Sequence, residues 1–277
     1  MLLSSMRAAH LGSSSDGTTP SQGPAWPVEI CLLGGFRLLR WGEPVPGRAA
    51  GKVEALLSCL ALGNRHGVPR ETLLNVLWPD GDSALAGQSL NSLIYSLRRL
   101  LGEHIANHAP VVTESGTYRL NLEAGISVDV VRFDALVLAG DRQLRGGDRR
   151  AAAESYTSAV DLYRGDLCAT GTPAMAIERE RLRATYLTLL ARLADFHLAE
   201  DDAPASLRFA QALLSGDPCR EDALRMVMRC YVRLGERAQA LRQFRLSEAM
   251  LRSEFDAAPE SATLELWDQV RLHPESV

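Results

Sequence analysis

Lysine is nearly absent from this sequence: of its 30 basic residues only Lys52 is lysine, and all the others are arginine. Such a bias is most simply explained by a GC-rich coding genome, as in high-GC bacteria. An excess of positive charge is also missing, because 34 acidic residues outnumber the basic ones and the formal net charge is -4. Residues 28–125 carry nine basic and nine acidic side chains, and residues 126–277 carry 20 and 24. Overall charge therefore does not indicate nucleic-acid binding, and any DNA contact must come from a local arrangement.

Long apolar runs are missing too. No segment has 18 uninterrupted apolar residues, so the sequence predicts no membrane span and no membrane partner. Residues 1–27 are rich in Ser, Gly, Thr and Pro and lack the apolar core of a signal peptide. We therefore expect a disordered leader and a cytoplasmic protein.

Motifs for metal, nucleotide or covalent chemistry are also missing. The five cysteines contain no C-x-x-C pair and no histidine at ligand spacing, so we expect reduced, buried thiols rather than disulfides or a zinc site. No G-x-x-x-x-G-K-[ST] segment occurs. The carboxylates of Glu200–Asp202 lie at a predicted turn, and the histidines form no triad with a Ser or Cys nucleophile. The sequence therefore predicts no enzyme, no cofactor and no metal.

The polar face of one predicted helix is the first positive indication of function. In "QSLNSLIYSLRRLLG" (Gln88–Gly102), spacings of three and four put the apolar residues on one side, which is the stripe that a helix buries: Leu90, Leu93, Ile94, Leu97 and Leu101. The opposite side carries amides, hydroxyls and cations: Gln88, Asn91, Ser92, Tyr95, Arg98 and Arg99. This set suits base edges and phosphates. The alternative is a solvent-facing side whose two arginines pair with nearby carboxylates.

The elements around this helix occur in the order of a winged helix. Residues 28–125 read as a strand pair around Gly34-Gly35, three helices, and a hairpin around Ser115-Gly116. The predicted ranges are strands Val28–Leu33 and Phe36–Trp41, a short strand near Pro44–Val45, helices Lys52–Leu62 and Pro69–Trp78, the long helix capped by Asp82 or Ser83, and strands Val111–Glu114 and Thr117–Leu122. In such a module the third helix enters the major groove and the hairpin follows the neighbouring backbone or minor groove.

This frame gives the polar face a role in DNA recognition. Arginine can bridge two acceptors of guanine, asparagine and glutamine can bridge adenine, and each good pairing contributes about 1–3 kcal/mol of discrimination. We predict DNA contacts from the polar residues of the helix and, in the wing, from Ser115, Thr117 and Arg119. Tyr118 alternates with Thr117 and Arg119 along its strand, so we predict that it lies in the core.

Residues 126–277 carry a helical repeat. Three segments share a turn residue, a small residue five positions on and an aromatic residue nine positions on: Gly147, Ala152 and Tyr156; Glu200, Ala205 and Phe209; Gly235, Ala240 and Phe244. The second and third copies are 35 residues apart, close to the period of about 34 in tetratricopeptide repeats. Stacked repeats of this kind form a curved array that holds a protein or peptide on its concave face, or else supplies a dimer interface or rigid support.

Four segments follow one another in a distinctive order: "LWPD" (Leu77–Asp80), "SLRRLLG" (Ser96–Gly102), "GTYRL" (Gly116–Leu120) and "VDVVRFDAL" (Val128–Leu136). Together they resemble the Streptomyces antibiotic regulatory protein family. That family joins a winged helix of the response-regulator type to a bacterial transcriptional activator domain, and the resemblance covers about residues 28–272. It implies a pathway-specific activator of secondary-metabolite gene clusters. Such an activator binds direct repeats in promoters as two protomers side by side and recruits RNA polymerase through the sigma factor and other subunits.

The resemblance also implies which positions contact DNA, namely the helix from Gln88 to Arg99 and the wing from Ser115 to Arg119. This recognition segment departs from the family in one respect. Serines and Asn91 stand where members often have another arginine, which bears on operator sequence and affinity more than on binding mode.

The sequence thus predicts a mainly α protein with a small β component. The expected parts are a leader over residues 1–27, an N-terminal winged helix-turn-helix over 28–125 and an all-α tetratricopeptide-like activator domain over 126–277. The expected function is sequence-specific transcriptional activation, with double-stranded DNA, RNA polymerase and a second protomer as partners. Two alternatives stay open: a protein-interaction scaffold whose winged helix does not bind DNA, and an array that binds a small regulatory ligand.

Overall fold

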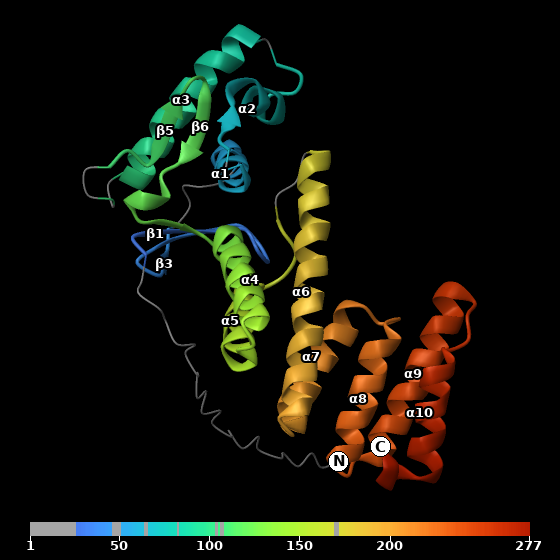
Figure 1. Ribbon diagram of the computed structural model, residues 1–277. Coiled ribbons are helices and arrows are strands. Elements are labelled where there is room, and N and C mark those ends of the chain that lie inside the picture. The colour runs from blue at the N-terminus through green and yellow to red at the C-terminus, as the bar shows by residue number, and fades with distance from the viewer. Residues whose placement is uncertain are drawn as a thin grey trace, which may run out of the picture.

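The computed structural model describes residues 26–45, 51–63, 66–81, 83–102, 105, 108–168 and 172–277. Across these ranges the chain is mainly helical with two small sheets, and a winged helix-turn-helix precedes a helical array (Figure 1). The predicted fold class is confirmed. Residues 1–25 of the predicted leader and the predicted N-cap Asp82 lie outside the described residues.

The first sheet has four strands in the order β3-β2-β1-β7. β1 (Val28–Cys31) and β2 (Arg37–Arg40) form the expected antiparallel pair, and β3 (Glu43–Pro44) lies at its edge. β7 (Ile126–Val128) follows the wing in the chain and pairs parallel with β1. β7 was not predicted, because a run of three residues is too short to show strand alternation. The sheet therefore joins residues on both sides of the predicted boundary at residues 125 and 126.

The second sheet, in the order β4-β6-β5, forms the wing. β5 (Val111–Glu114) and β6 (Thr117–Leu120) make the predicted hairpin, and β4 (Val68–Pro69) pairs with the other side of β6. Both residues of the hairpin turn have positive φ, 48° at Ser115 and 80° at Gly116, a geometry that matches the twist of paired strands. β6 ends two residues earlier than predicted, because a 3-10 helix, η1 (Leu122–Ala124), begins there.

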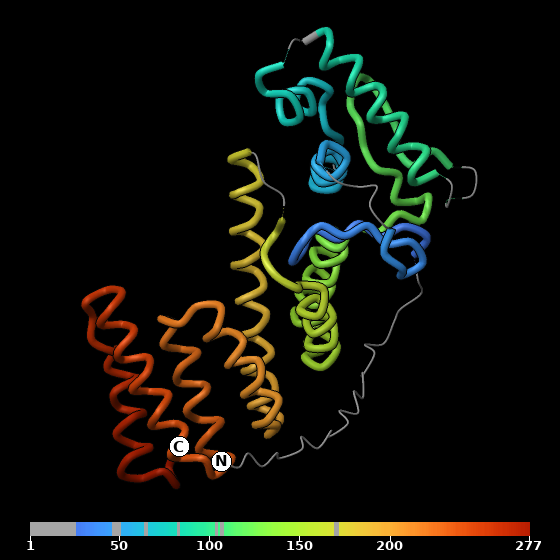
Figure 2. Tube along the Cα trace, turned by 180° about the vertical axis from the view of Figure 1, so that it is seen from behind, coloured from blue at the N-terminus to red at the C-terminus, as the bar shows by residue number. Residues whose placement is uncertain are grey.

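Three helices pack beside the wing. α1 (Lys52–Leu62) has the predicted bounds. α2 (Arg70–Leu77) is one residue shorter at each end than the predicted Pro69–Trp78, because Pro69 and Trp78 are its cap residues. α3 (Ser83–Gly102) is the long helix with the polar face. The core between these helices and the wing is built from fully buried side chains: Leu56, Leu57, Leu60, Leu73, Leu90, Leu97, Val111 and Leu120. In Figure 2 the N-terminal strands lie between this unit and the helical array.

The remaining helices form the array. Their bounds are α4 (Asp129–Arg145), α5 (Arg149–Leu162), α6 (Pro173–Ala199), α7 (Ala203–Gly216), α8 (Glu221–Arg233), α9 (Arg237–Phe255) and α10 (Ser261–Leu272), with a short 3-10 helix, η2 (Pro274–Ser276), after them. The pairs α4–α5, α6–α7 and α8–α9 stack in chain order (Figure 1).

The three copies of the repeat pattern lie at equivalent places in these pairs. In each copy the turn residue joins the two helices, and the small residue after it is buried: Ala152, Ala205 and Ala240. Tyr156 and Phe244 are buried, and Phe209 is half-buried. The ring of Tyr156 packs so closely on α4 that a Cβ added at Gly140 would lie 2.4 Å from Tyr156 Cε1.

Asp129, the first residue of α4, connects the first sheet to the array. Its Oδ2 accepts hydrogen bonds from the backbone N–H groups of Leu32 and Leu33, both at 2.8 Å, and its Oδ1 accepts one from Val130. Burial raises the pKa of the Asp129 carboxyl, although the backbone donors oppose this effect. One continuous hydrophobic core runs from Val28 to Leu193, so the winged helix and the first helices of the array are not separately packed.

The five cysteines are free. Cys31, Cys59 and Cys230 are buried, and Cys168 and Cys219 are half-buried. Burial raises the pKa of the Cys31 and Cys59 thiols to about 11, so both are protonated at neutral pH. Among the described residues, no helix combines the length and apolarity that crossing a bilayer requires.

Candidate nucleic-acid interface

α3 divides its side chains between core and solvent as its sequence predicts. Leu90, Ile94, Leu97 and Leu101 are at most 4% exposed, and Leu93 is half-buried. Because residues three and four apart share a face, these buried side chains fix how α3 is rotated about its own axis. The opposite side is therefore the one that a partner can reach.

The outermost side chains of α3 form a line that we call the outer stripe: Gln88, Ser92, Tyr95 and Arg99. All of them are exposed, and they recur at spacings of four, three and four. Tyr95 is 70% exposed although it is aromatic. The hydroxyl of Ser92 donates to the Gln88 carbonyl at 3.2 Å. The stripe thus offers an amide, a hydroxyl, a phenol and a guanidinium to whatever the helix meets.

The other two predicted helix residues, Asn91 and Arg98, lie on the flank of α3 that faces the wing. Arg98 Nη2 donates to the Val111 carbonyl at 3.2 Å and to Thr113 Oγ1 at 3.1 Å, both on β5. Asn91 Oδ1 accepts a hydrogen bond from Arg70 at 2.9 Å. Both side chains are exposed. Some of their hydrogen-bonding groups, however, are already used in contacts that hold the helix in place.

Arg70, at the first residue of α2, is a functional residue that the sequence analysis missed. Its Nη1 donates to Asn91 Oδ1 at 2.9 Å and to the Tyr118 hydroxyl at 3.0 Å, and its Nη2 donates to the Gly87 carbonyl at 2.9 Å. One guanidinium therefore links α2, α3 and β6. The position of Arg70 in the first turn of the predicted helix could have indicated this role. A cation there interacts unfavourably with the helix dipole unless other groups contact it.

A shallow groove runs along the other flank of α3. It is lined by Lys52, Trp78, Leu85, Gln88, Ser89, Ser92, Leu93 and Ser96. Lys52 Nζ lies 4.2 Å from the centroid of the Trp78 ring, a cation–π contact that holds the cation beside the serines. Lys52 is at the start of α1 and Trp78 is at the end of α2. Sequence spacing therefore could not predict that Lys52 lies at this groove.

The wing residues differ in how they are held. Ser115 and Arg119 are exposed, whereas Thr117 is half-buried and its hydroxyl donates to the Glu114 carbonyl. Arg119 Nη2 lies 3.9 Å from Glu114 Oε2, an exposed pair of little energetic weight. Tyr118 is 8% exposed, which confirms its predicted core position.

Together these residues form a surface suited to a polyanion. The outer stripe, the tip of the wing and the groove present donors and cations from α1, α3 and β6. Hydrogen bonds from Arg70 and Arg98 fix the helix relative to the wing. In the part of the chain that the structure describes, no group of three or more His, Cys, Asp or Glu residues could hold a metal ion. Polar contact with phosphates and base edges is the chemistry that this surface can perform.

Comparison with known proteins places the chain among bacterial regulators. Residues 128–271 match the family described as "Bacterial transcriptional activator domain". Regulatory protein AfsR of Streptomyces coelicolor is 25% identical over 240 residues, which are 86% of this chain and 24% of AfsR. Regulatory protein DnrI of Streptomyces peucetius is 28% identical over 220 residues, which are 76% of this chain and 80% of DnrI. The chain thus spans about a quarter of the length of AfsR and most of DnrI.

A solved structure has the same fold. Mycobacterium tuberculosis EmbR, determined in complex with a low-affinity phosphopeptide, superposes with a TM-score of 0.71 at 22% identity, covering 89% of this chain and 65% of that one. The domain match covers more than half of the 277 residues, and the relatives carry it in regulatory proteins of Streptomyces. The chain therefore belongs to the bacterial transcriptional activator domain family, and within it to the Streptomyces antibiotic regulatory proteins.

Proposed function

We propose that this chain is a sequence-specific DNA-binding activator of transcription, acting on a secondary-metabolite gene cluster such as one for an antibiotic. It binds direct repeats in promoters, where a second protomer binds beside it, and it recruits RNA polymerase through the sigma factor and other subunits. Membership of a family of transcriptional regulators supports this proposal.

The outer stripe of α3 is the observation that carries the proposal. A helix fits the major groove, and the residues that point away from its core meet the base edges. Gln88 and Arg99 at the two ends of the stripe have the two chemistries that read adenine and guanine, and Tyr95 and Ser92 lie between them. Tyr95 is 70% exposed, so its ring and hydroxyl are accessible to a partner.

The wing and the groove extend the same surface. Arg119 is exposed beside one carboxylate, and we assign it a phosphate contact. Ser115 is exposed at the tip of the wing and is assigned a second contact. Arg98 and Asn91 contact DNA from the flank while they hold the helix to the wing. A net charge of zero over residues 28–125 does not prevent binding, because the nearest charges decide the contact energy.

The test is a gel shift of the full chain on promoter fragments from its own genomic neighbourhood, at two salt concentrations, with a footprint of each shifted band. Each phosphate that the protein neutralises contributes about 0.9 to the slope of log affinity against log salt, so specific binding should weaken steeply as salt rises. We expect a footprint over tandem repeats. Transcription in vitro with purified polymerase then tests recruitment, which should raise the yield from the same fragment.

If the protein is instead a protein-interaction scaffold, we expect no gel shift. Folded protein that shifts no fragment at low salt would contradict DNA binding and favour a winged helix that docks a protein. The variant Gln88→Ala combined with Arg99→Ala tests the role of α3, because both residues are exposed on the outer stripe and neither packs in the core. An unchanged footprint from this double variant would remove α3 as the reading helix.

A further inference from the structure

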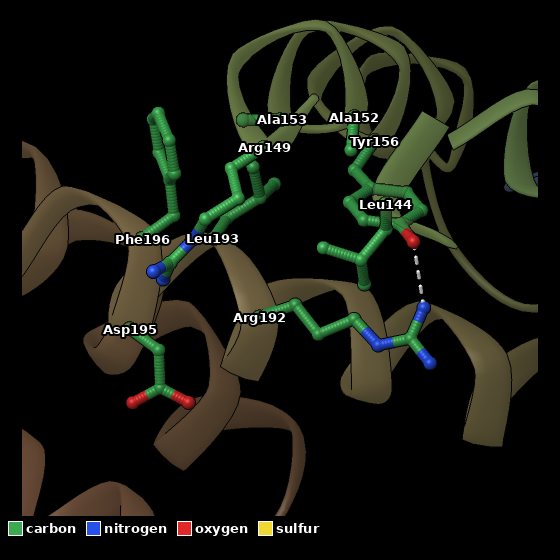
Figure 3. A pocket seen from close by; sticks show the side chains of 9 residues that line it. All are labelled: Leu144, Arg149, Ala152, Ala153, Tyr156, Arg192, Leu193, Asp195 and Phe196. Carbon is green, nitrogen blue, oxygen red and sulfur yellow. Dashed lines mark hydrogen bonds between the residues drawn. The ribbon is translucent and has the colours of Figure 1, made fainter. Parts of the chain in front are cut away.

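A pocket of about 170 Å³ lies between the α4–α5 pair and α6 (Figure 3). Its floor is apolar and formed by small or buried side chains, Ala152, Ala153 and Leu193. Leu144 and Phe196 stand at its sides. Ligand pockets for small molecules measure about 300–1,000 Å³, whereas a cavity of about 150 Å³ holds a benzene ring. This pocket therefore has room for one large apolar side chain.

The repeat supplies an internal comparison, because the interface between α7 and α8 is built from the equivalent positions of the next copy. Six positions after the turn residue stands Ala153 in the first copy and Ser206 in the second. Ser206 is fully buried, its hydroxyl donates to the Ala194 carbonyl at 2.8 Å, and Cys230 Sγ lies 3.2 Å from it. In the first copy Ala153 has no such group, and the position equivalent to Cys230 is Asp195, which lines the pocket.

The polar rim of the pocket also differs from the equivalent position of the next copy. Arg192 lies eight residues before the turn, where the next copy has the fully buried Val227. Arg192 Nη1 donates to Asp141 Oδ1 and to the Tyr156 hydroxyl. With the residues that the structure describes, its Nε and Nη2 groups make no hydrogen bond. These N–H groups lie at the rim of the pocket and can donate to an acceptor on a ligand.

Positive charge gathers at the same place. The turn between α4 and α5 carries Arg142, Arg145, Arg149 and Arg150, in a chain whose net charge is -4. Over the described ranges only Arg150 of these four comes within ion-pair distance of a carboxylate, at 3.7 Å from Glu154. Arg149 lies at the first position of α5 and also lines the pocket. A cation at the positive end of a helix dipole is unfavourable for folding. The N-cap carboxylate of Asp148, which accepts from the Ala151 N–H at 3.0 Å, offsets part of this cost, and an incoming anion would offset more.

We propose that this pocket anchors an acidic segment of a partner protein, which inserts one large apolar side chain between α5 and α6 while a neighbouring carboxylate pairs with Arg149 and Arg192. A peptide fits the chemistry better than a nucleic acid does. The floor is apolar, and Asp195 on the rim can accept a peptide N–H. The inference rests on the packing of the array and is independent of DNA binding by α3.

The experiment is a titration of the full chain with the peptide acetyl-Gly-Glu-Leu-Asp-Gly-amide, followed by the amide resonances of Ala153 and Leu193. We expect saturable shifts at millimolar peptide. Arg149→Glu should weaken binding by at least about tenfold, because it replaces a charge-assisted bond with repulsion. Its matched control is Arg150→Glu, one residue away and outside the pocket lining, which should change affinity by less than about twofold.

A second variant tests the apolar anchor. Ala153→Leu places in the pocket the residue that the third copy has at this position, Leu241, and should abolish the shifts. A peptide with Ser in place of Leu should bind at least about tenfold more weakly, as expected for losing one buried side chain. Melting temperatures verify that each variant is folded, and if Ala153→Leu unfolds, the Arg149 and Arg150 pair decides alone.

Four results would overturn the proposal. They are the absence of saturable shifts, equal losses from the two arginine reversals, equal binding of the serine peptide, and the same resonance shifts caused by duplex DNA. The last result would identify a phosphate-binding patch instead. Gel shifts of Arg149→Glu should match those of the unmodified chain, so failure here is distinguishable from failure of the proposed DNA binding.

Discussion

Single arginines in the winged helix have separable tasks. Arg70 and Arg98 donate hydrogen bonds that tie α3 to α2 and to the wing. Arg99 belongs to the outer stripe, and Arg119 lies on the wing beside a single weakly held carboxylate. A cation that positions an element affects folding when it is removed, whereas one that only meets DNA affects binding. The distinction gives two predictions at this scale.

Arg99→Ala should lower the affinity for operator DNA by about 1–3 kcal/mol without unfolding the protein. If the residue holds a phosphate, the salt slope should also fall by about 0.9. Gel shifts at several salt concentrations measure both quantities. Arg150→Ala is the control, since it removes an exposed arginine in the array. Equal effects of the two substitutions would mean that only overall charge matters.

Arg70→Ala should lower the free energy of unfolding by about 1–3 kcal/mol, because it leaves Asn91, the Tyr118 hydroxyl and the Gly87 carbonyl without their donor. Arg70→Lys should recover only part of the loss, since an ammonium group does not reproduce the planar fork. Denaturant unfolding measures the difference. Arg119→Ala, by contrast, should stay within about 0.5 kcal/mol of the unmodified chain, and a larger loss there would contradict this division of tasks.

At the scale of elements, α4 and α5 approach closely because a glycine faces an aromatic ring. The ring of Tyr156 occupies the place where a Cβ of Gly140 would lie. It cannot swing aside without breaking the bonds from its hydroxyl to Asp141 at 2.7 Å and from Arg192 at 2.9 Å. The first helix pair of the array therefore depends on one missing side chain.

Gly140→Ala should destabilise the protein by about 1–3 kcal/mol, the usual cost of overpacking a core. Gly102→Ala is a matched control near the end of another helix, since its added Cβ would be 3.9 Å from the nearest atom, Pro110 Cδ. There the better helix propensity of alanine should leave stability unchanged or higher. Thermal melting of both variants settles the point, and equal melting temperatures would contradict the tight α4–α5 contact.

At the scale of the whole molecule, the two halves are joined by a continuous core and by one buried carboxylate. The N–H groups of Leu32 and Leu33 have Asp129 as their acceptor across the junction between β1 and α4. The isolated bridge between Leu33 and Leu167 lies at the same junction. The winged helix and the first helices of the array are thus joined by packed side chains.

Asp129→Ala should lower the free energy of unfolding by about 2–4 kcal/mol at neutral pH, because two buried N–H groups lose their acceptor. Burial raises the folded pKa of Asp129 above its unfolded value of about 3.9. Its protonation therefore favours the folded state, and its contribution to stability grows as pH falls through the folded pKa. The gap between the unmodified chain and the variant should widen in acid. Denaturant unfolding at several pH values measures it, with exposed Glu123→Ala as the control, and a gap that narrows would contradict the burial effect.

Local chemistry explains what could be predicted. The bounds of α1, the buried side of α3, the wing hairpin and the spacing of Ala152 and Tyr156 follow from helical periodicity and turn residues within short windows. The outer stripe was predicted among the polar residues of α3 for the same reason. The sequence did not predict that Asn91 and Arg98 lie apart from this stripe, because their hydrogen-bond partners come from α2 and β5.

The sequence by itself determined the fold class, the family and the buried side of α3, since each of these depends on neighbours within a few turns or on the order of segments. Only the tertiary structure decided that β7 pairs with β1, that Arg70 bridges three elements, that Lys52 reaches the groove beside α3, and that Ala153 lines a pocket while the equivalent Ser206 donates to the Ala194 carbonyl. The physical reason is common to all four. Each contact joins residues far apart in the chain, and their meeting is set by how whole elements pack rather than by any local preference.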